Sequence, residues 1–225
     1  MEARDTKDYG TAPRYSIAEA ARILRLKPPT LRTWCVGWQE TRSRRAQPPV
    51  IRPDGERVDG TYLSFFNLIE AGFLNAYRET GATMQRVRRA LEFCRSRLEI
   101  ERPLLTEHFR IDGRSLLIEF DKALLNASAS GQHVWPDLVE RWLRDIDFDV
   151  LGPRQVWLAG RENAILVNPR IGFGLPVIAS CGVRTEEIVA RFHAGEGPRE
   201  IAEDLGAKED EVIEAIRWET TPLAA

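Results

Sequence analysis

Hydrogen-bond donors gather in the first 57 residues of this sequence, in an arrangement suited to a phosphate backbone and to the edges of bases. Four of them fall within seven consecutive positions: Lys27, Thr30, Arg32 and Thr33. Five more arginines follow: Arg42, Arg44, Arg45, Arg52 and Arg57. Lys and Arg side chains neutralise phosphates, and Arg and Thr side chains also read base edges in the major groove. The chemistry that we predict for this region is therefore the binding of double-stranded DNA.

The charge of the chain is divided unequally between its two ends. Residues 1–52 contain 11 Lys and Arg against 5 Asp and Glu, a balance of +6, whereas residues 185–225 contain 4 against 11, a balance of −7. The formal net charge of −2 hides this difference. A phosphate backbone attracts the first segment and repels the second. We therefore expect one end to bind DNA and the other end to bind something else.

The first four donors need two short helices to position them. Apolar residues recur with helical spacing over 17–24, and Ser16 is a suitable N-cap. Pro28 and Pro29 end any continuous helix because proline lacks an amide donor, but both are accepted in the first turn of a new helix. We predict a helix-turn-helix over 15–34, with the four donors at the front of its second helix.

The arginines that follow lie in a segment with the composition of a β-hairpin. Residues 41–61 are rich in Arg, Pro and Gly, and Asp54-Gly55 stands between two apolar pairs. Because Asp-Gly favours a tight hairpin turn, we predict a basic wing with its turn at these two residues. Clustered arginines are often only a solvated loop, and that alternative stays open. Beside a helix-turn-helix we favour phosphate contacts.

The remaining sequence predicts short strands followed by helices. Helical spacing continues after the wing and stops before Pro103. The later elements that we predict are a second hairpin at 108–120, a short helix at 136–144, brief strands at 155–158 and 164–167, and helices from 185 onward interrupted at Gly195 and Gly206. The predicted fold class is α+β and predominantly helical. Its three predicted parts are a winged helix-turn-helix domain at 14–102, a β-containing connecting region at 103–160 and a small three-helix, helix-turn-helix-like domain at 161–225.

Two motifs in the N-terminal part have the spacing of a known family. The motifs are Tyr15-x-Ile17-x-Glu19-x-Ala21, continuing through Leu26, Pro28, Thr30-Leu31-Arg32 and Trp34, and then Tyr62-Leu63-Ser64-Phe65 through Gly81 to Leu91. Over residues 14–100 the sequence resembles the winged helix-turn-helix of the MerR family of transcription regulators. That family commonly has glycine in the turn, where this sequence has Arg25. We expect either a different turn geometry or a left-handed backbone at Arg25.

A second resemblance covers the C-terminal part. It rests on the segments Asn168 to Ile178, Val183 to Ile188 and Gly197 to Leu205. These segments resemble a small C-terminal domain of VapB-type antitoxins, although the run at 180–184 departs from the usual pattern. Together the two resemblances imply a full-length VapB-type antitoxin that binds its own operator as an autorepressor and neutralises a PIN-domain ribonuclease toxin. Since helix-turn-helix proteins usually bind two half-sites, we also expect a homodimer.

The acidic C-terminal helices are better suited to a protein partner than to DNA. Their outward positions are mostly Asp and Glu, which a phosphate backbone would repel. Two large apolar side chains, Trp218 and Phe192, are the candidate residues for a partner or dimer interface. Acidic residues that only keep the domain soluble are an alternative that the sequence leaves open.

Several functional classes find no support in the sequence. No apolar run approaches the ~20 residues of a membrane span, and the N-terminus lacks the apolar segment of a secretory signal, so we expect a cytoplasmic protein. Cys35, Cys94 and Cys181 are widely separated, which predicts buried thiols rather than disulfides or a zinc site. The acidic run Asp145-x-Asp147-x-Asp149 lacks the glycine and the distant Glu of a calcium loop. We expect no metal, no cofactor and no enzymatic activity.

Two other functions remain compatible with the sequence. A ligand-responsive regulator of the MerR type would hold a small molecule within 103–225, although Pro103 and the hairpin signals after it disfavour the long pairing helix that such regulators use. An enzyme with a DNA-binding tether would need convergent polar groups from distant positions, and no such set is visible in the sequence.

Overall fold

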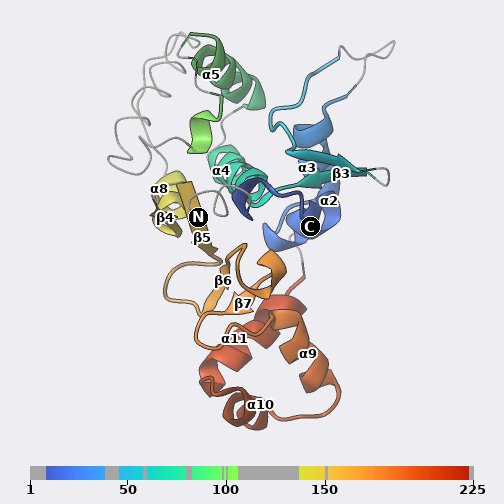
Figure 1. The fold of residues 1–225 in the computed structure, drawn as a ribbon, viewed down its shortest axis with the longest axis vertical. Helices are drawn as coiled ribbons and strands as arrows, with labels where there is room; N and C mark the ends of the chain where they lie inside the picture. Colours follow the sequence, from blue (N-terminus) through green and yellow to red (C-terminus); the bar gives the residue numbers. More distant parts are fainter. Residues whose placement is uncertain are drawn as a thin grey trace, which may run out of the picture.

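The computed structural model describes residues 9–38, 46–57, 60–79, 83–97, 99, 101–105, 137–149 and 152–222. The predicted hairpin at 108–120 lies outside these residues, as do Arg42, Arg44 and Arg45. In Figure 1 the molecule is long in one direction, with α5 near one end and the C-terminal helices at the other.

The first described unit is a pair of short helices followed by a small sheet and two longer helices. Its elements are β1 (Tyr15–Ser16), α2 (Ile17–Ile23), α3 (Pro28–Val36), β2 (Gly55–Arg57), β3 (Gly60–Leu63), α4 (Phe65–Glu79) and α5 (Met84–Arg97). The sheet is antiparallel with the order β1-β3-β2, and Tyr15 pairs with Leu63. The predicted N-cap at Ser16 and the proline start of the second helix are both confirmed.

The predicted hairpin is present, but the predicted position of its turn is wrong. Gly55 already belongs to β2 and pairs with Tyr62, and the pairing continues to Arg57 with Gly60, so Asp54-Gly55 is not the turn. The Asp54 side chain accepts a hydrogen bond from the Ser64 hydroxyl and forms an ion pair with Arg102. Asp54 therefore lies at the base of the hairpin and fixes it there. The sequence had predicted that Asp54 lies in the turn at the tip of the hairpin.

The second half of the chain builds a four-stranded sheet and then three helices. Its elements are η1 (Pro103–Leu105), α8 (Asp137–Arg144), β4 (Ile146–Asp149), β5 (Gly152–Trp157), β6 (Ile165–Val167), η2 (Gly172–Gly174), β7 (Val177–Ile178), α9 (Thr185–His193), α10 (Pro198–Leu205) and α11 (Glu209–Thr220). The strands are antiparallel in the order β4-β5-β6-β7. The strands predicted at 155–158 and 164–167 are confirmed as β5 and β6, and Gly206 ends α10 in a left-handed conformation.

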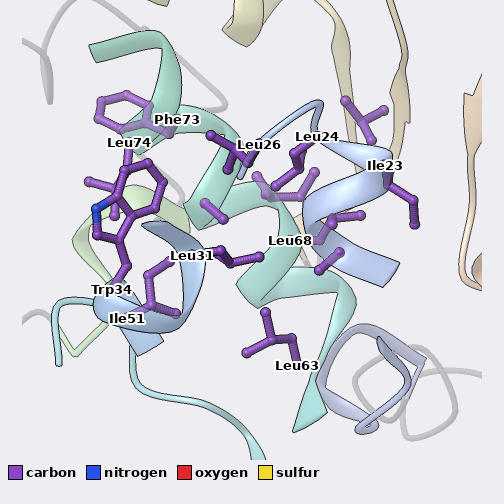
Figure 2. Packing of buried hydrophobic residues seen from close by; sticks show 14 of the residues in the cluster. Ile23, Leu24, Leu26, Leu31, Trp34, Ile51, Leu63, Leu68, Phe73 and Leu74 are labelled. Carbon is purple, nitrogen blue, oxygen red and sulfur yellow. The ribbon is translucent and has the colours of Figure 1, made fainter. Parts of the chain in front are cut away.

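One large apolar cluster joins the N-terminal unit to the sheet. Leu31 and Trp34 on α3 pack with Leu68 and Leu74 on α4, as Figure 2 shows. The same cluster continues through Val156 on β5 and neighbouring strand residues. A smaller cluster holds the last three helices together and includes Ile178, Ile188, Ile201, Ala202, Val212 and Ala215. The three-part division at 102 and 160 stays a prediction.

Within the described residues, no helix combines the length and the apolar character that crossing a membrane requires.

Candidate nucleic-acid interface

A capping box begins α2, and a left-handed residue makes the turn from α2 to α3. The Ser16 hydroxyl accepts a hydrogen bond from the Glu19 amide at 3.2 Å, and the Glu19 carboxylate accepts one from the Ser16 amide at 2.8 Å. The chain then turns at Arg25, whose φ of 55° is left-handed. The amide of Leu26 donates back to the Ala21 carbonyl at 2.8 Å. Arg25 thus adopts the conformation for which glycine is the usual choice.

The N-terminus of α3 offers side chains rather than backbone amides to an anion. Lys27 is the exposed N-cap, and the next two residues are Pro28 and Pro29, which have no N–H. The amides of Thr30 and Leu31 both donate to the Lys27 carbonyl, at 2.9 and 3.3 Å. The helix end therefore lacks the free amides with which many helices bind phosphate, and any contact with DNA depends on side chains.

Three predicted DNA-contacting residues of α3 lie away from its buried face. Leu31, Trp34 and Cys35 are buried against the core, whereas Arg32 is exposed and Thr30 and Thr33 are half-buried. The Thr33 hydroxyl donates to the Pro29 carbonyl at 2.9 Å, so its remaining capacity is as an acceptor. The arrangement leaves Arg32 as the most accessible donor of this helix.

The wing arginines are only partly described. Arg52 is exposed just before the hairpin, and Arg57 is the last residue of β2. The other three wing arginines that we predicted to contact DNA, Arg42, Arg44 and Arg45, lie outside the described residues. The position of Arg52 and of the Arg57 backbone is compatible with a basic wing beside α3, and their contacts with DNA stay a prediction.

A buried asparagine fixes the base of the wing to α4. The Asn67 side-chain oxygen accepts hydrogen bonds from the amides of Asp54 and Ser64, at 3.0 and 3.1 Å. Its nitrogen donates to the Arg52 carbonyl at 2.9 Å and to the Glu70 carboxylate at 3.0 Å. All four hydrogen-bonding positions of this fully buried amide are therefore used. The network ties both ends of the hairpin to one helix.

Glu70 brings a buried carboxylate into the same network. Burial raises its pKa, and nearby Arg102 opposes that shift. The Arg102 guanidinium lies 3.9 Å from the Glu70 carboxylate and also pairs with Asp54. Sequence analysis missed this network. The available signal was a pair of polar residues, Asn67 and Glu70, spaced three apart within an otherwise apolar helix face.

Two arginines of α5 bind backbone carbonyls of the segment that leads into the wing. Arg88 donates to the Pro48 carbonyl, and Arg95 donates to the Val50 carbonyl at 3.0 Å. Burial lowers the pKa of both guanidinium groups. These side chains position the segment between α3 and the wing.

The acidic end of the chain contacts the turn of the helix-turn-helix. Arg25 places its guanidinium 4.1 Å from the centre of the Trp218 ring and donates to the carbonyls of Trp218 and, at 2.8 Å, Thr221. Arg22 forms an ion pair with Glu219 at 2.6 Å. The second Glu219 oxygen accepts a hydrogen bond from the Thr185 hydroxyl at 2.6 Å. We call these contacts the arginine clasp.

Trp218, one of the two predicted interface residues, contacts Arg25 of the same chain in the arginine clasp. Trp218 is half-buried and packs against the large core cluster, whereas Phe192 is 38% exposed at the end of α9. A role of either residue in a partner or dimer interface stays a prediction. A more exposed aromatic residue, which sequence analysis did not select, is Phe173, with 81% of its surface accessible.

The acidic surface keeps its excess charge after its internal ion pairs are counted. Arg191 pairs with Glu196 and Asp204, Arg199 pairs with Glu203, and Arg217 pairs with Glu214. These pairs use all three arginines of residues 185–225. The remaining carboxylates on α9, α10 and α11 therefore give this end a negative field that would oppose a phosphate backbone.

The described cysteines are buried or half-buried, and Asp147 of the acidic run is hydrogen-bonded to its neighbours. Cys35 is buried, which raises its pKa to about 12, and Cys181 is half-buried. The carboxylate of Asp147 accepts hydrogen bonds from Gln155 and Trp157, at 2.7 and 3.0 Å, and pairs with Arg161. Hydrogen bonds from these groups lower its pKa. Among the described residues, no three His, Cys, Asp or Glu side chains form a group that could hold a metal ion.

Comparisons with known proteins agree with the division between the two ends. Residues 13–91 match a family model described as "Putative DNA-binding HTH domain", and residues 165–218 match one described as "Protein of unknown function (DUF433)". A protein of Mycobacterium tuberculosis (strain ATCC 25618 / H37Rv), named "Putative antitoxin VapB45", is 28% identical. That likeness covers 91% of this chain and 92% of the relative. The chain is a homologue of this VapB protein.

A solved structure supports the fold. The crystal structure of Rv2018 from Mycobacterium tuberculosis superposes with a TM-score of 0.73 at 27% identity, over 91% of this chain and 98% of that chain. The N-terminal unit is thus a DNA-binding type of helix-turn-helix, within a mixed fold of helices and two small sheets.

Proposed function

We propose that this protein is the antitoxin of a type II toxin-antitoxin pair. In this proposal its basic N-terminal unit binds operator DNA as an autorepressor, and its acidic C-terminal region neutralises a PIN-domain ribonuclease. The observation on which it chiefly rests is full-length similarity to a protein named as an antitoxin, combined with opposite charges at the two ends. The same proposal makes the protein a regulator without enzymatic activity.

The DNA-binding half of the proposal follows the geometry of α3 and the wing. In this proposal Arg32, which is exposed, enters the major groove with Lys27, Thr30 and Thr33 beside it, and Arg52 and Arg57 contact phosphates along the wing. The MerR-like order of elements supports this assignment, since the wing follows the second helix and is held by α4. Two such units on a palindromic operator require a homodimer.

The toxin-binding half rests on the unneutralised carboxylates of the last three helices. A PIN-type nuclease must attract polyanionic RNA, so its active-site rim is expected to carry cationic side chains. An acidic surface would compete with RNA for that rim and slow its approach. In this way the region neutralises the toxin by covering its entrance.

Both halves can be tested together with separate readouts. The chain is co-expressed with the product of the open reading frame beside its gene, and complex formation, RNA cleavage and binding to the upstream DNA are measured. We expect a stable complex, suppressed cleavage and salt-dependent DNA binding. If no complex forms and cleavage continues unchanged, the antitoxin assignment is wrong even where DNA binding persists.

A further inference from the structure

A cavity of about 340 Å³ lies where the helix-turn-helix, the sheet and α11 meet. Its wall contains Ile23, Leu24 and Arg25 from the end of α2 and its turn, together with residues of α4, α8, the loop after β5 and α11. Cavities of this size are within the range that holds small molecules. Neither the DNA-binding nor the toxin-binding proposal uses this cavity.

The cavity contains a buried carboxylate that lacks a hydrogen-bond donor. Asp145 follows α8 and is 8% exposed. Its backbone amide donates to the carbonyls of Arg141 and Trp142, but within the described part of the chain no group donates to its carboxylate. Burial raises the pKa of this carboxyl group and Glu162 acts in the same direction, while Arg161, Arg141 and Arg144 act against the shift. The carboxylate therefore keeps its capacity to accept hydrogen bonds from an occupant of the cavity.

Three tryptophans line the same cavity. Trp142, Trp157 and Trp218 come from α8, β5 and α11. Arg25 already lies over the Trp218 ring, and the Trp157 nitrogen donates to Asp147. The Trp142 nitrogen is buried and, among the described residues, has no acceptor. Indole faces are the strongest cation-binding surfaces among side chains.

The ionisable side chains around the cavity carry charges of both signs. Its wall has three carboxylates, from Glu79, Asp145 and Glu162, against two guanidinium groups, from Arg25 and Arg141. Arg25 is engaged by the arginine clasp. Arg144 and Arg161 also act on Asp145 from outside the wall, but within the described residues no cationic group lies at ion-pair distance from its carboxylate.

We propose that this cavity binds a small organic cation, an amine, amidine or guanidine on a flat apolar body, with its charged group on Asp145. The tryptophan rings cover the apolar body. Because Arg25 and Trp218 form part of the wall, an occupant also contacts the place where the acidic end meets the helix-turn-helix. The site thus connects a ligand to the DNA-binding unit.

Benzamidine and benzamide provide a matched test on the full chain, because they share a shape and differ in charge. Binding is measured by calorimetry and by the shift of the tryptophan indole N–H signals. We expect benzamidine to bind about tenfold more tightly than benzamide, as for a charge-assisted hydrogen bond. Equal binding of the two compounds by the wild-type protein overturns the proposal without any variant.

Asp145→Asn then locates the site. This variant keeps the shape of the side chain and removes the buried charge, so we expect unchanged or higher thermal stability together with loss of the tenfold preference. Glu209→Gln, on the exposed first turn of α11 and outside the cavity, is the matched control and should keep the preference. If Asp145→Asn still prefers benzamidine, the proposed site is wrong. Neither readout involves DNA or a toxin, so failure here is distinguishable from failure of the antitoxin proposal.

Discussion

The two ends of this chain are both built from short helices, yet they differ in what surrounds those helices. The basic unit has its second helix and wing fixed by a buried polar network around Asn67 and Glu70. The acidic unit is held by a small apolar cluster and by ion pairs at its surface, such as Arg191 with Glu196. Buried polar networks specify one geometry, whereas exposed ion pairs contribute little. The comparison indicates that the basic unit needs a defined shape and the acidic unit mainly needs a defined charge.

The largest expected effect comes from breaking the network of the basic unit. Asn67→Ala removes four hydrogen bonds and leaves the amides of Asp54 and Ser64 without their acceptor, so we expect a loss of about 2–4 kcal/mol in unfolding free energy. Urea denaturation measures this loss. Asn75→Ala, on the same helix, removes only an exposed bond to Glu79 and should cost less than about 1 kcal/mol. Similar losses in the two variants would contradict the special role of the network.

The next largest expected effect is on DNA affinity, which should depend on an arginine of the basic end and not on one of the acidic end. Arg32→Ala should weaken binding to the upstream region by about 1–3 kcal/mol and reduce its salt dependence. Fluorescence anisotropy over a salt series measures both quantities. Arg199→Ala removes another exposed arginine, from the acidic C-terminal helices, where it pairs with Glu203, and should leave DNA affinity unchanged. An unchanged salt series for Arg32→Ala would remove α3 from the DNA interface.

A smaller effect is expected where the two ends meet. Glu219→Gln removes the ion pair with Arg22, which is partly exposed, and weakens the arginine clasp, so we expect a loss of about 1 kcal/mol. Thermal unfolding and limited proteolysis follow the change. Glu214→Gln breaks the more exposed pair with Arg217 and is expected to have no measurable effect. Equal behaviour of the two variants would show that the clasp does not hold the ends together.

The smallest effect concerns pH. The pKa of Glu70 is raised in the folded protein, so the folded state holds this proton more tightly than the unfolded state does. The contribution of Glu70 to stability is therefore poorest above its folded pKa, where it no longer depends on pH, and improves as the pH falls from that pKa to the ordinary pKa of a glutamate. Glu70→Gln should remove this pH dependence and keep a hydrogen bond to Asn67. A pH profile of stability identical to that of the wild-type protein would show that Glu70 does not titrate in this way.

Local patterns in the sequence predicted most of the elements. Ser16, the Pro28-Pro29 pair and Gly206 mark helix ends by their backbone chemistry, which does not depend on distant residues. The Asp54-Gly55 turn was predicted wrongly because Asp54 is held by Arg102 and Ser64, and such long-range partners leave no periodic signal. Local turn propensity was therefore overridden by tertiary contacts.

The candidate site was predicted only in part for a similar reason. Exposed donors such as Arg32 could be selected because charge and spacing are visible in the sequence. The network around Asn67 and the clasp at Trp218 could not be predicted from the sequence, because each joins residues that are far apart in the chain. The sequence shows arginine at position 25, where the MerR family commonly has glycine. Only the structure shows that this arginine contacts Trp218 and Thr221.

The left-handed Arg25 limits how freely this chain can be cut and recombined. A left-handed conformation costs a non-glycine residue about 1–2 kcal/mol, and here the same side chain is held by the backbone of Trp218 and Thr221. A chimera that joins this helix-turn-helix to a foreign C-terminal domain would keep the free-energy cost of the left-handed backbone. It would lose the hydrogen bonds from Arg25 to Trp218 and Thr221 that offset this cost. Such a fusion would need glycine at position 25, so the two ends are not interchangeable modules.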